Sequence, residues 1–284
     1  MSQTAAAADQ PKVLIAFYSR SGVTEALANA VAEGARASGA EVRLRRAREV
    51  VPPEVMSKAP GWREAAEAMN AKYEAPTEAD AEWADAIVFG SPTRFGNVSS
   101  ELKAYIDGLG GLWFQGKLNG KAGSVFGSSS TPHGGNESTL ISLYNPLAHL
   151  GLIIVPLGYA DPAMFKAGTP YGASSVSQNQ AAPPTEDDLE VARFQGRRVA
   201  FVARALKAAG VTETKEGQAD QVGQGRRHDR AAPTWSPWFS FVAVTPAALS
   251  ARATNATRRP WNRATSWSSS VGGAALLKDT AEAP

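Results

Sequence analysis

A buried strand that runs directly into a hydroxyl-rich turn and then a helix is the feature that most constrains this chain. The apolar run Val13–Tyr18 predicts the strand, and the helix is expected to begin near Thr24. Ser19 and Ser21 lie in the turn between them, where the first N–H groups of a helix have no intrahelical partner. Together with the helix dipole, those groups favour an anion such as a phosphate. An ordinary Ser/Thr helix cap explains the turn equally well when the turn is considered alone.

Two common nucleotide-binding patterns are absent from this turn. It contains neither the G-x-x-x-x-G-K-[ST] pattern of nucleoside triphosphate loops nor the G-x-G-x-x-G pattern of dinucleotide turns. If the turn binds a phosphate, we therefore expect a ligand of another kind.

Strand-like runs alternate with helical patterns up to about Val211, which predicts a parallel α/β sheet. The expected strands are Val13–Tyr18, Glu41–Arg46, Ala86–Gly90, Ala122–Ser128 and Leu152–Pro156. The expected helices are Thr24–Ser38, Ser99–Leu109, Glu137–Leu150 and Thr185–Ala209. This pattern favours a flavodoxin-like, doubly wound, five-stranded parallel sheet of order 2-1-3-4-5 with helices on both faces. Ligands of such sheets bind beyond the carboxyl ends of the strands.

Two segments exceed what this unit requires. Val50–Asp80 is a long excursion between the second and third strands, with helical character around Trp62–Asn70. Gly158–Pro184 is rich in Gly, Pro and Ser and follows the fifth strand. Long insertions in compact domains commonly serve function or assembly.

The composition divides the chain into three parts. We expect a disordered N-terminus over residues 1–10, a folded domain over 11–211 and a disordered extension over 212–284. The extension carries nine basic and six acidic residues and four of the seven tryptophans, which also fits a basic, aromatic arm for nucleic acid or membrane. Because the basic residues are scattered without an amphipathic face, disorder is the favoured interpretation.

Composition also limits the classes of function. A hydrophobic fraction of 43% and a charged fraction of 20% are typical of a soluble globular protein, and the net charge of +2 argues against a dominant nucleic-acid partner. The absence of cysteine excludes disulfides and thiolate chemistry. With no signal peptide and no apolar run of roughly 20 residues, we expect a cytoplasmic protein without a membrane span.

Two further loops follow the third and fourth expected strands. Ser91–Ser99 contains Pro92, Arg94, Phe95 and Gly96, so it combines a stiffened turn, a cation, an aromatic ring and a position of close backbone approach. A plain connection capped by Ser99 is the alternative. Phe126–Glu137 is a run of small and hydroxylated residues that leaves room for a flat ligand, although it also fits a flexible connection. Three such loops at successive strand ends indicate a binding site more strongly than any one of them.

The two histidines of this region do not indicate a metal or a nucleophile. His133 lies in the third loop, and His149 lies near the end of the next helix, where histidine usually interacts with the helix dipole. Neither has neighbours at metal-ligand spacing, and the sequence contains no Gly-x-Ser-x-Gly elbow. Metal-dependent and hydrolase functions are therefore disfavoured.

The three loops, together with Leu109-Gly-Gly-Leu-Trp113 and Leu152–Tyr159, resemble the WrbA family of flavodoxin-like, FMN-dependent NAD(P)H:quinone oxidoreductases. The resemblance covers about residues 11–209. It includes Ser-Pro-Thr-Arg-Phe-Gly-Asn, His-Gly-Gly-Asn-Glu and Thr169–Ala173.

The resemblance implies an FMN site built from all three loops. It implies that the phosphate is held by Ser19, Arg20, Ser21, Gly22, Val23 and Thr24. It implies that the isoalloxazine is met by Thr93, Arg94, Phe95, Ser128, Ser129, Ser130, Thr131, Pro132, His133 and Gly134. Pro92, Gly96 and Asn97 of the second loop are also implied to bind the cofactor. His149 would reach the flavin pocket, from a neighbouring subunit of a homotetramer (a dimer of dimers), and Trp113 would stack over the quinone. Ser21 occupies a position of nicotinamide contact where the family often has an aromatic residue.

The expected reaction is a ping-pong cycle in which NADH or NADPH reduces FMN and a quinone then takes two electrons. No catalytic side chain is expected, because the flavin performs the redox chemistry. Two alternatives remain at this point: a flavodoxin-type electron carrier, and a DNA-associated regulator that uses the basic tail. Electron-carrier flavodoxins are usually strongly acidic, whereas the body of this chain is near neutral, and DNA binding would weaken steeply with salt.

Overall fold

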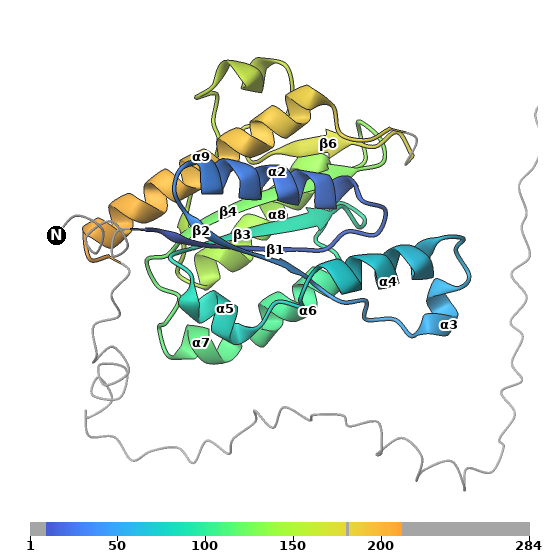
Figure 1. Cartoon of the computed structure of the whole chain (residues 1–284), viewed down its shortest axis with the longest axis horizontal. Helices are drawn as coiled ribbons and strands as arrows, with labels where there is room; N and C mark the ends of the chain where they lie inside the picture. The colour runs from blue at the N-terminus through green and yellow to red at the C-terminus, as the bar shows by residue number, and fades with distance from the viewer. Residues whose placement is uncertain (1–9, 180–181, 212–284) are drawn as a thin grey trace, which may run out of the picture. The chain divides into compact units, whose positions relative to one another are not determined.

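The computed structural model describes residues 10–179 and 182–211, which form a parallel sheet covered by helices on both faces (Figure 1). Its strands are β1 (Lys12–Phe17), β2 (Glu41–Arg46), β3 (Ala86–Pro92), β4 (Ala122–Ser129), β5 (Ile153–Ile154) and β6 (Ser174–Val176). Its helices are α2 (Val23–Ala37), α3 (Pro53–Met56), α4 (Trp62–Lys72), α5 (Glu78–Trp83), α6 (Ser100–Gly108), α7 (Gly110–Phe114), α8 (Asn136–His149), the 3₁₀ helix η1 (Pro162–Phe165) and α9 (Glu186–Ala208).

The strand order is β2-β1-β3-β4-β5, and the pairings are parallel. This order confirms the flavodoxin-like fold expected from the sequence. The central strands are buried on both faces, which explains why they read as continuous apolar runs rather than as alternating patterns.

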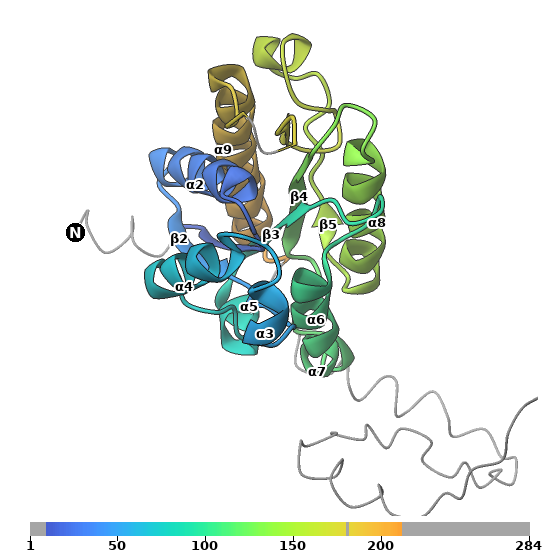
Figure 2. The ribbon, with the colours of Figure 1, turned by 90° about the vertical axis from the view of Figure 1, so that its right-hand side faces the viewer.

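Two apolar clusters cover the two faces of the sheet. On one face α2 and α9 pack over Val13, Ile15 and Phe17, and on the other α6, α7 and α8 pack over Leu14 and Ile87 (Figure 2). Alternate residues of β1 therefore enter opposite clusters, as the period of a strand requires. The carboxyl ends of β1, β3 and β4 are left at one edge, where their loops meet.

Helices α2 and α9 cross at a contact that only glycine permits. A Cβ on Gly196 of α9 would lie 2.0 Å from the carbonyl oxygen of Val31, and one on Gly34 of α2 would lie 1.9 Å from that of Arg193. Because the opposing atoms belong to backbones, a larger side chain would force the two helices apart. This contact sets how closely α2 lies against the domain.

The edge of the sheet beyond β4 differs from expectation. The predicted strand Leu152–Pro156 is only the two-residue β5, which pairs with Ala122 and Gly123 at the start of β4. The other half of the edge is β6, from within the predicted irregular segment, and it pairs with Gly127–Ser129. The sequence conceals β6 because Ser174 and Ser175 have no apolar pattern, although both side chains are buried.

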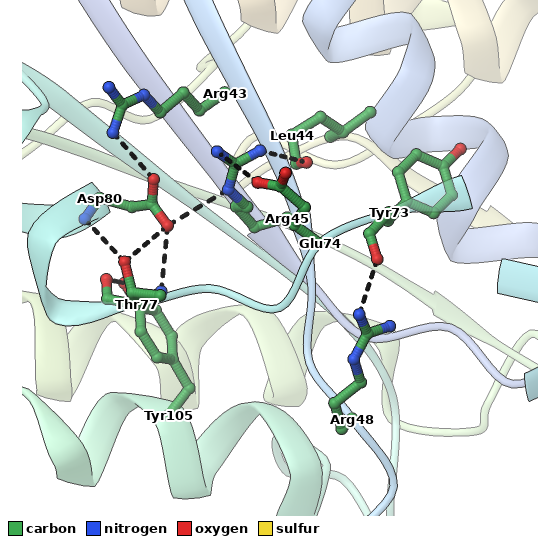
Figure 3. A network of polar contacts seen from close by, with 9 residues as sticks. All are labelled: Arg43, Leu44, Arg45, Arg48, Tyr73, Glu74, Thr77, Asp80 and Tyr105. Carbon is green, nitrogen blue, oxygen red and sulfur yellow. Dashed lines mark hydrogen bonds and ion pairs between the residues drawn. The ribbon is translucent and has the colours of Figure 1, made fainter. Parts of the chain in front are cut away.

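The excursion between β2 and β3 contains more helix than the sequence indicated. Helix α4 confirms the helical character expected around Trp62–Asn70, whereas α3 and α5 were not predicted. Helix α5 begins at a capping box in which the Thr77 hydroxyl accepts from the Asp80 N–H and the Asp80 carboxylate accepts from the Thr77 N–H. That carboxylate also accepts from Arg43 at 3.0 Å and Arg45 at 3.2 Å, which ties α5 to β2 (Figure 3).

The expected disordered segments fall mostly outside the described residues. Residues 1–9 and 212–284, and with them the four tail tryptophans and the scattered basic residues, are not among those that the structure describes. Over residues 10–179 and 182–211, none of the helices has the length and apolar character that crossing a membrane requires.

Candidate cofactor site

A polar cavity of about 310 Å³ lies at the carboxyl ends of β1, β3 and β4. Its volume is at the lower end of the range of about 300–1,000 Å³ that is typical of small-molecule sites. It is lined by Ser19, Arg20, Ser21, Val23, Thr24, Pro92, Thr93, Arg94, Ser128, Ser129, Ser130 and Ser177. All but Ser177 were expected to contribute to cofactor binding, so the three loops do meet at one site.

The start of α2 opens on this cavity without a side-chain cap. Its N-cap residue is Gly22, in the left-handed conformation with φ 93°, and the Ser19 hydroxyl accepts from the Gly22 N–H at 3.1 Å instead of from the helix. By contrast, Ser99 caps α6 and Thr185 caps α9 with their side chains. Of the two alternatives for this turn, the Ser/Thr cap is therefore not the one that the structure shows, and no side chain among the described residues accepts from the N–H groups of the first turn of α2. This absence of a cap favours the anion-site interpretation of the turn.

Hydrogen bonds between the loops hold the cavity together. The Thr24 and Ser128 hydroxyls are 2.9 Å apart, and the Thr93 N–H donates to the Ser128 carbonyl at 2.7 Å. Ser128 thereby links the first loop to the second. Thr24 is 1% exposed and Ser128 is 6% exposed, so the framework beneath the ligand space is formed in the free protein.

The second loop folds as a tight hairpin whose tip projects from the cavity. Arg94 and Asn97 exchange backbone hydrogen bonds at 2.9 and 3.0 Å, and the Gly96 N–H donates to the Thr93 hydroxyl at 3.2 Å. Phe95, at the tip, has φ 54° and a fully exposed side chain. Among the amides of the described loop from Thr93 to Val98, the N–H of Phe95 is the one without an acceptor. Most backbone amides of this loop are therefore already engaged, within the loop or with the Ser128 carbonyl.

The third loop is held by β6 and the residues after it. Ser177 donates its N–H to the Ser129 carbonyl at 2.8 Å, and the Asn179 N–H donates to the Ser130 carbonyl at 2.9 Å. Sequence reasoning missed Ser177 because it lay in a segment assigned no strand. Its signal was the Ser174-Ser-Val-Ser177 run, which becomes informative only when β6 is known to pair with β4.

Several expected site residues lie outside the cavity lining. Phe95, Asn97, Thr131, Pro132 and His133 are exposed near it. Gly22, Gly96 and Gly134 are half-buried in the loops themselves. Trp113 projects from α7 with 53% of its surface exposed, and His149 is exposed in the last turn of α8. The roles of Trp113 and His149 stay predictions, since both side chains are open to partners outside this chain.

The charge around the cavity favours an anion. Arg20 and Arg94 line it, and no carboxylate does so among the described residues. Over the same described ranges, no cluster of three or more His, Asp or Glu side chains is arranged to hold a metal ion.

A buried guanidinium supports the first loop from below. Arg46, at the end of β2, is fully buried and donates to the Ser19 carbonyl at 2.9 Å. It also donates to the Glu49 carboxylate at 2.5 and 3.3 Å and to the Asn70 side-chain oxygen at 2.6 Å. Burial raises the pKa of the adjacent Tyr18 hydroxyl, so that phenol carries no charge near neutral pH and Glu49 is the counter-ion of Arg46. Nothing in the strand-like pattern of β2 indicated this role.

The sequence that forms this site is similar to sequences of known proteins. Residues 12–163, more than half of the chain, match the family described as NADPH-dependent FMN reductase. The chain is 46% identical over 202 residues to an NAD(P)H dehydrogenase (quinone) from Geotalea uraniireducens (strain Rf4), covering 69% of this chain and 98% of that protein. A WrbA-like flavodoxin structure from Agrobacterium tumefaciens is 28% identical with a TM-score of 0.49, covering 69% of this chain and 99% of that one.

The matched region contains the strands β1, β3 and β4 and the three loops that follow them. The residues that form the cavity are therefore, apart from Ser177, inside the shared sequence. The resemblance to the WrbA family is confirmed, and the chain belongs to the NADPH-dependent FMN reductase family.

Proposed function

We propose that this protein is an FMN-dependent NAD(P)H:quinone oxidoreductase. The observation that carries the proposal is the uncapped N-terminus of α2, which opens on a cavity lined by hydroxyls and two arginines. Membership of the FMN reductase family and 46% identity to a quinone-reducing NAD(P)H dehydrogenase support the same activity.

The residues present fit FMN. The free N–H groups of α2 and the hydroxyls of Ser19, Ser21 and Thr24 suit a phosphate, because they offer donors and no competing carboxylate. The segments Pro92–Asn97 and Ser128–Gly134 begin at the ends of β3 and β4 and would flank the isoalloxazine. We assign the remaining contacts to His149, from a second subunit, and to Trp113, over the quinone.

When bound, FMN supplies the redox chemistry, accepting a hydride from NAD(P)H and delivering two electrons to a quinone. The part of this chain is to bind and orient. The Phe95 N–H, which has no acceptor among the described residues, would donate to the flavin ring, and Arg94 would supply a positive charge beside it. No side-chain acid or base is assigned a proton transfer.

A matched pair of variants tests the phosphate site. Ser21 is exposed and lines the cavity, so Ser21→Asp adds a charge without disturbing the core, and Ser21→Asn is its neutral control. We expect Ser21→Asp to weaken FMN binding at least about tenfold relative to Ser21→Asn, because a carboxylate would repel the phosphate across a few ångströms. Equal affinities of the two variants, measured by quenching of flavin fluorescence, would argue against a phosphate at this turn.

Steady-state kinetics tests the reaction. The FMN-loaded protein should oxidise NADH in the presence of benzoquinone, and double-reciprocal plots at several quinone concentrations should be parallel, as a ping-pong cycle requires. FMN binding without quinone-dependent turnover would refute the enzyme and leave the electron carrier. The near-neutral body disfavours that carrier.

We further propose a cytoplasmic homotetramer, a dimer of dimers, whose cofactor domain spans residues 11–211. Sedimentation velocity and FMN titration of the full chain and of a chain truncated after Val211 test the subunit number and the bounds of the cofactor domain. The two chains should form assemblies of the same subunit number and bind FMN equally. Loss of FMN binding on truncation would place residues 212–284 in the functional unit.

A further inference from the structure

Helix α4, in the excursion between β2 and β3, is fastened to the turn that begins α2. Lys72 and Tyr73, at its end, donate to the Glu25 carboxylate in the first turn of α2 at 2.7 and 2.8 Å. Asn70, one turn earlier, accepts from the same Arg46 that supports the Ser19 carbonyl. The sequence position of this insertion gives no reason for such contacts.

The beginning of α4 contacts the turn through an aromatic ring. The guanidinium carbon of Arg20 lies 3.8 Å from the centre of the Trp62 ring, which is the separation of a close cation–π contact. Arg20 lines the cavity, and among the described residues its guanidinium has neither a hydrogen-bond acceptor nor a carboxylate partner. The N–H donors of Arg20 are therefore available to a ligand, while the contact with Trp62 fixes the position of the guanidinium.

The ring is held at this place at an energetic cost. The indole N–H of Trp62 is buried, and no acceptor for it lies among the described residues. A buried donor without a partner is unfavourable, so hydrogen bonding does not explain a tryptophan here. The face of the indole does contact the Arg20 guanidinium.

We propose that Trp62 is a positioning residue that holds Arg20 for the cofactor phosphate, so that the site selects a phosphorylated flavin over an unphosphorylated one. The inference rests on the proposed FMN site and assigns to the insertion a part in its selectivity. An arginine side chain has many rotamers, and binding must order it. Stacking on Trp62 orders the guanidinium in the free protein and leaves its edge for phosphate oxygens.

The neighbouring charges agree with this assignment. Glu25 is the acidic group closest to the turn along α2, and its carboxylate is engaged by Lys72 and Tyr73. Arg46 is neutralised by Glu49 beneath the turn. Among the described residues that line the cavity, Arg20 is therefore the cation at the turn before α2 without a carboxylate partner, whereas Arg94 belongs to the loop after β3.

The experiment compares two ligands that differ only in the phosphate, FMN and riboflavin. Dissociation constants are measured by flavin fluorescence for the full chain and for the single variants Trp62→Leu, Trp62→Phe and Arg20→Lys. The double variant Arg20→Gln/Trp62→Leu is compared with Arg20→Gln alone. We expect Trp62→Leu to weaken FMN about tenfold while the riboflavin constant changes less than about twofold. Trp62→Phe should retain part of the affinity because it keeps a ring face.

Two further results are expected. Arg20→Lys should lose affinity for FMN although the charge is kept, because an ammonium does not stack as a planar guanidinium does. In the Arg20→Gln background, Trp62→Leu should have no additional effect on FMN. A purely structural role of Trp62 would instead lower the affinities for FMN and riboflavin together.

The possible failures are distinguishable. If Trp62→Leu weakens both ligands equally, or leaves FMN binding unchanged, the positioning role is wrong and the proposed FMN site stands. If the unsubstituted chain binds neither FMN nor riboflavin, the proposed function fails and this inference fails with it. Far-UV circular dichroism of each variant shows that the domain remains folded.

Discussion

The substitution Arg46→Met tests how the cofactor turn is supported. Arg46 is completely buried and its guanidinium contacts the Ser19 carbonyl, the Glu49 carboxylate and the Asn70 amide. Methionine fills a similar volume but provides no donor. The Glu49 side chain, only 4% exposed, would then remain as a buried carboxylate without a counter-ion.

The magnitude follows from that stranded charge. Removing one partner of a buried ion pair costs about 3–5 kcal/mol, more than the pair itself contributes, because the remaining charge stays desolvated. We therefore expect Arg46→Met to lower the free energy of unfolding by about 4 kcal/mol. The double variant Arg46→Met/Glu49→Met removes the stranded carboxylate and should be destabilised by only about 1 kcal/mol.

Urea unfolding followed by circular dichroism measures the difference. With an m-value of about 2 kcal/mol/M, the midpoint of Arg46→Met should fall by about 2 M and that of the double variant by about 0.5 M. Arg63→Met is the control, because Arg63 forms an exposed i,i+4 pair with Glu67 on α4 and its loss should leave the midpoint unchanged. The reasoning is refuted if the double variant is as unstable as Arg46→Met.

Two further predictions concern the packing of the domain. Although burial raises the pKa of the Asp80 carboxyl, hydrogen bonds from Thr77, Arg43 and Arg45 outweigh it and hold that pKa below its usual value. The carboxylate therefore stabilises the fold above about pH 4 and this contribution is lost as the pH falls through the lowered pKa. Asp80→Asn should cost about 2 kcal/mol at pH 7 and flatten the acid limb of a stability–pH profile; an unchanged acid limb would contradict this. Gly196→Ala should destabilise by about 2 kcal/mol in thermal melts, since its Cβ would meet backbone of α2. Gly108→Ala is the control and should not destabilise the domain, because nothing lies within 4 Å of its Cβ. Equal losses of stability in the two variants would exclude the helix contact as the cause.

The sequence predicted those parts of the fold that depend on local pattern. Val13–Tyr18 and Ala86–Gly90 are continuous apolar runs, and such runs belong to strands buried on both faces. Thr185 with its following acids placed the start of α9, because capping is a local interaction between residues three apart. In both cases the residues that decide the structure are neighbours in the chain.

Features that depend on distant residues could not be predicted. β6 is a strand because Ser174–Val176 meets the free half of the β4 edge, and nothing within those residues indicates it. Likewise Arg46 reads as one more polar residue on an edge strand until Glu49 and Asn70 are placed around it. The choice between a Ser/Thr cap and an anion site at α2 could not be made from the turn alone for a related reason: Gly22 takes the left-handed conformation at the N-cap, and the Ser19 hydroxyl accepts from the Gly22 N–H rather than from the helix.

The turn before α2 keeps its shape without a side-chain cap on the helix. In a helix capped by its own Ser or Thr, the side chain occupies the N–H groups that a phosphate needs. Here the Ser19 hydroxyl is used within the turn, the Ser19 carbonyl is held by Arg46, and Thr24 bonds to Ser128 of the third loop. The turn therefore keeps its shape through contacts that leave the N–H groups of α2 unoccupied. One set of atoms therefore holds the turn in place, and another set, the N–H groups of α2, remains available to a ligand. An anion site that is formed before its ligand binds needs both.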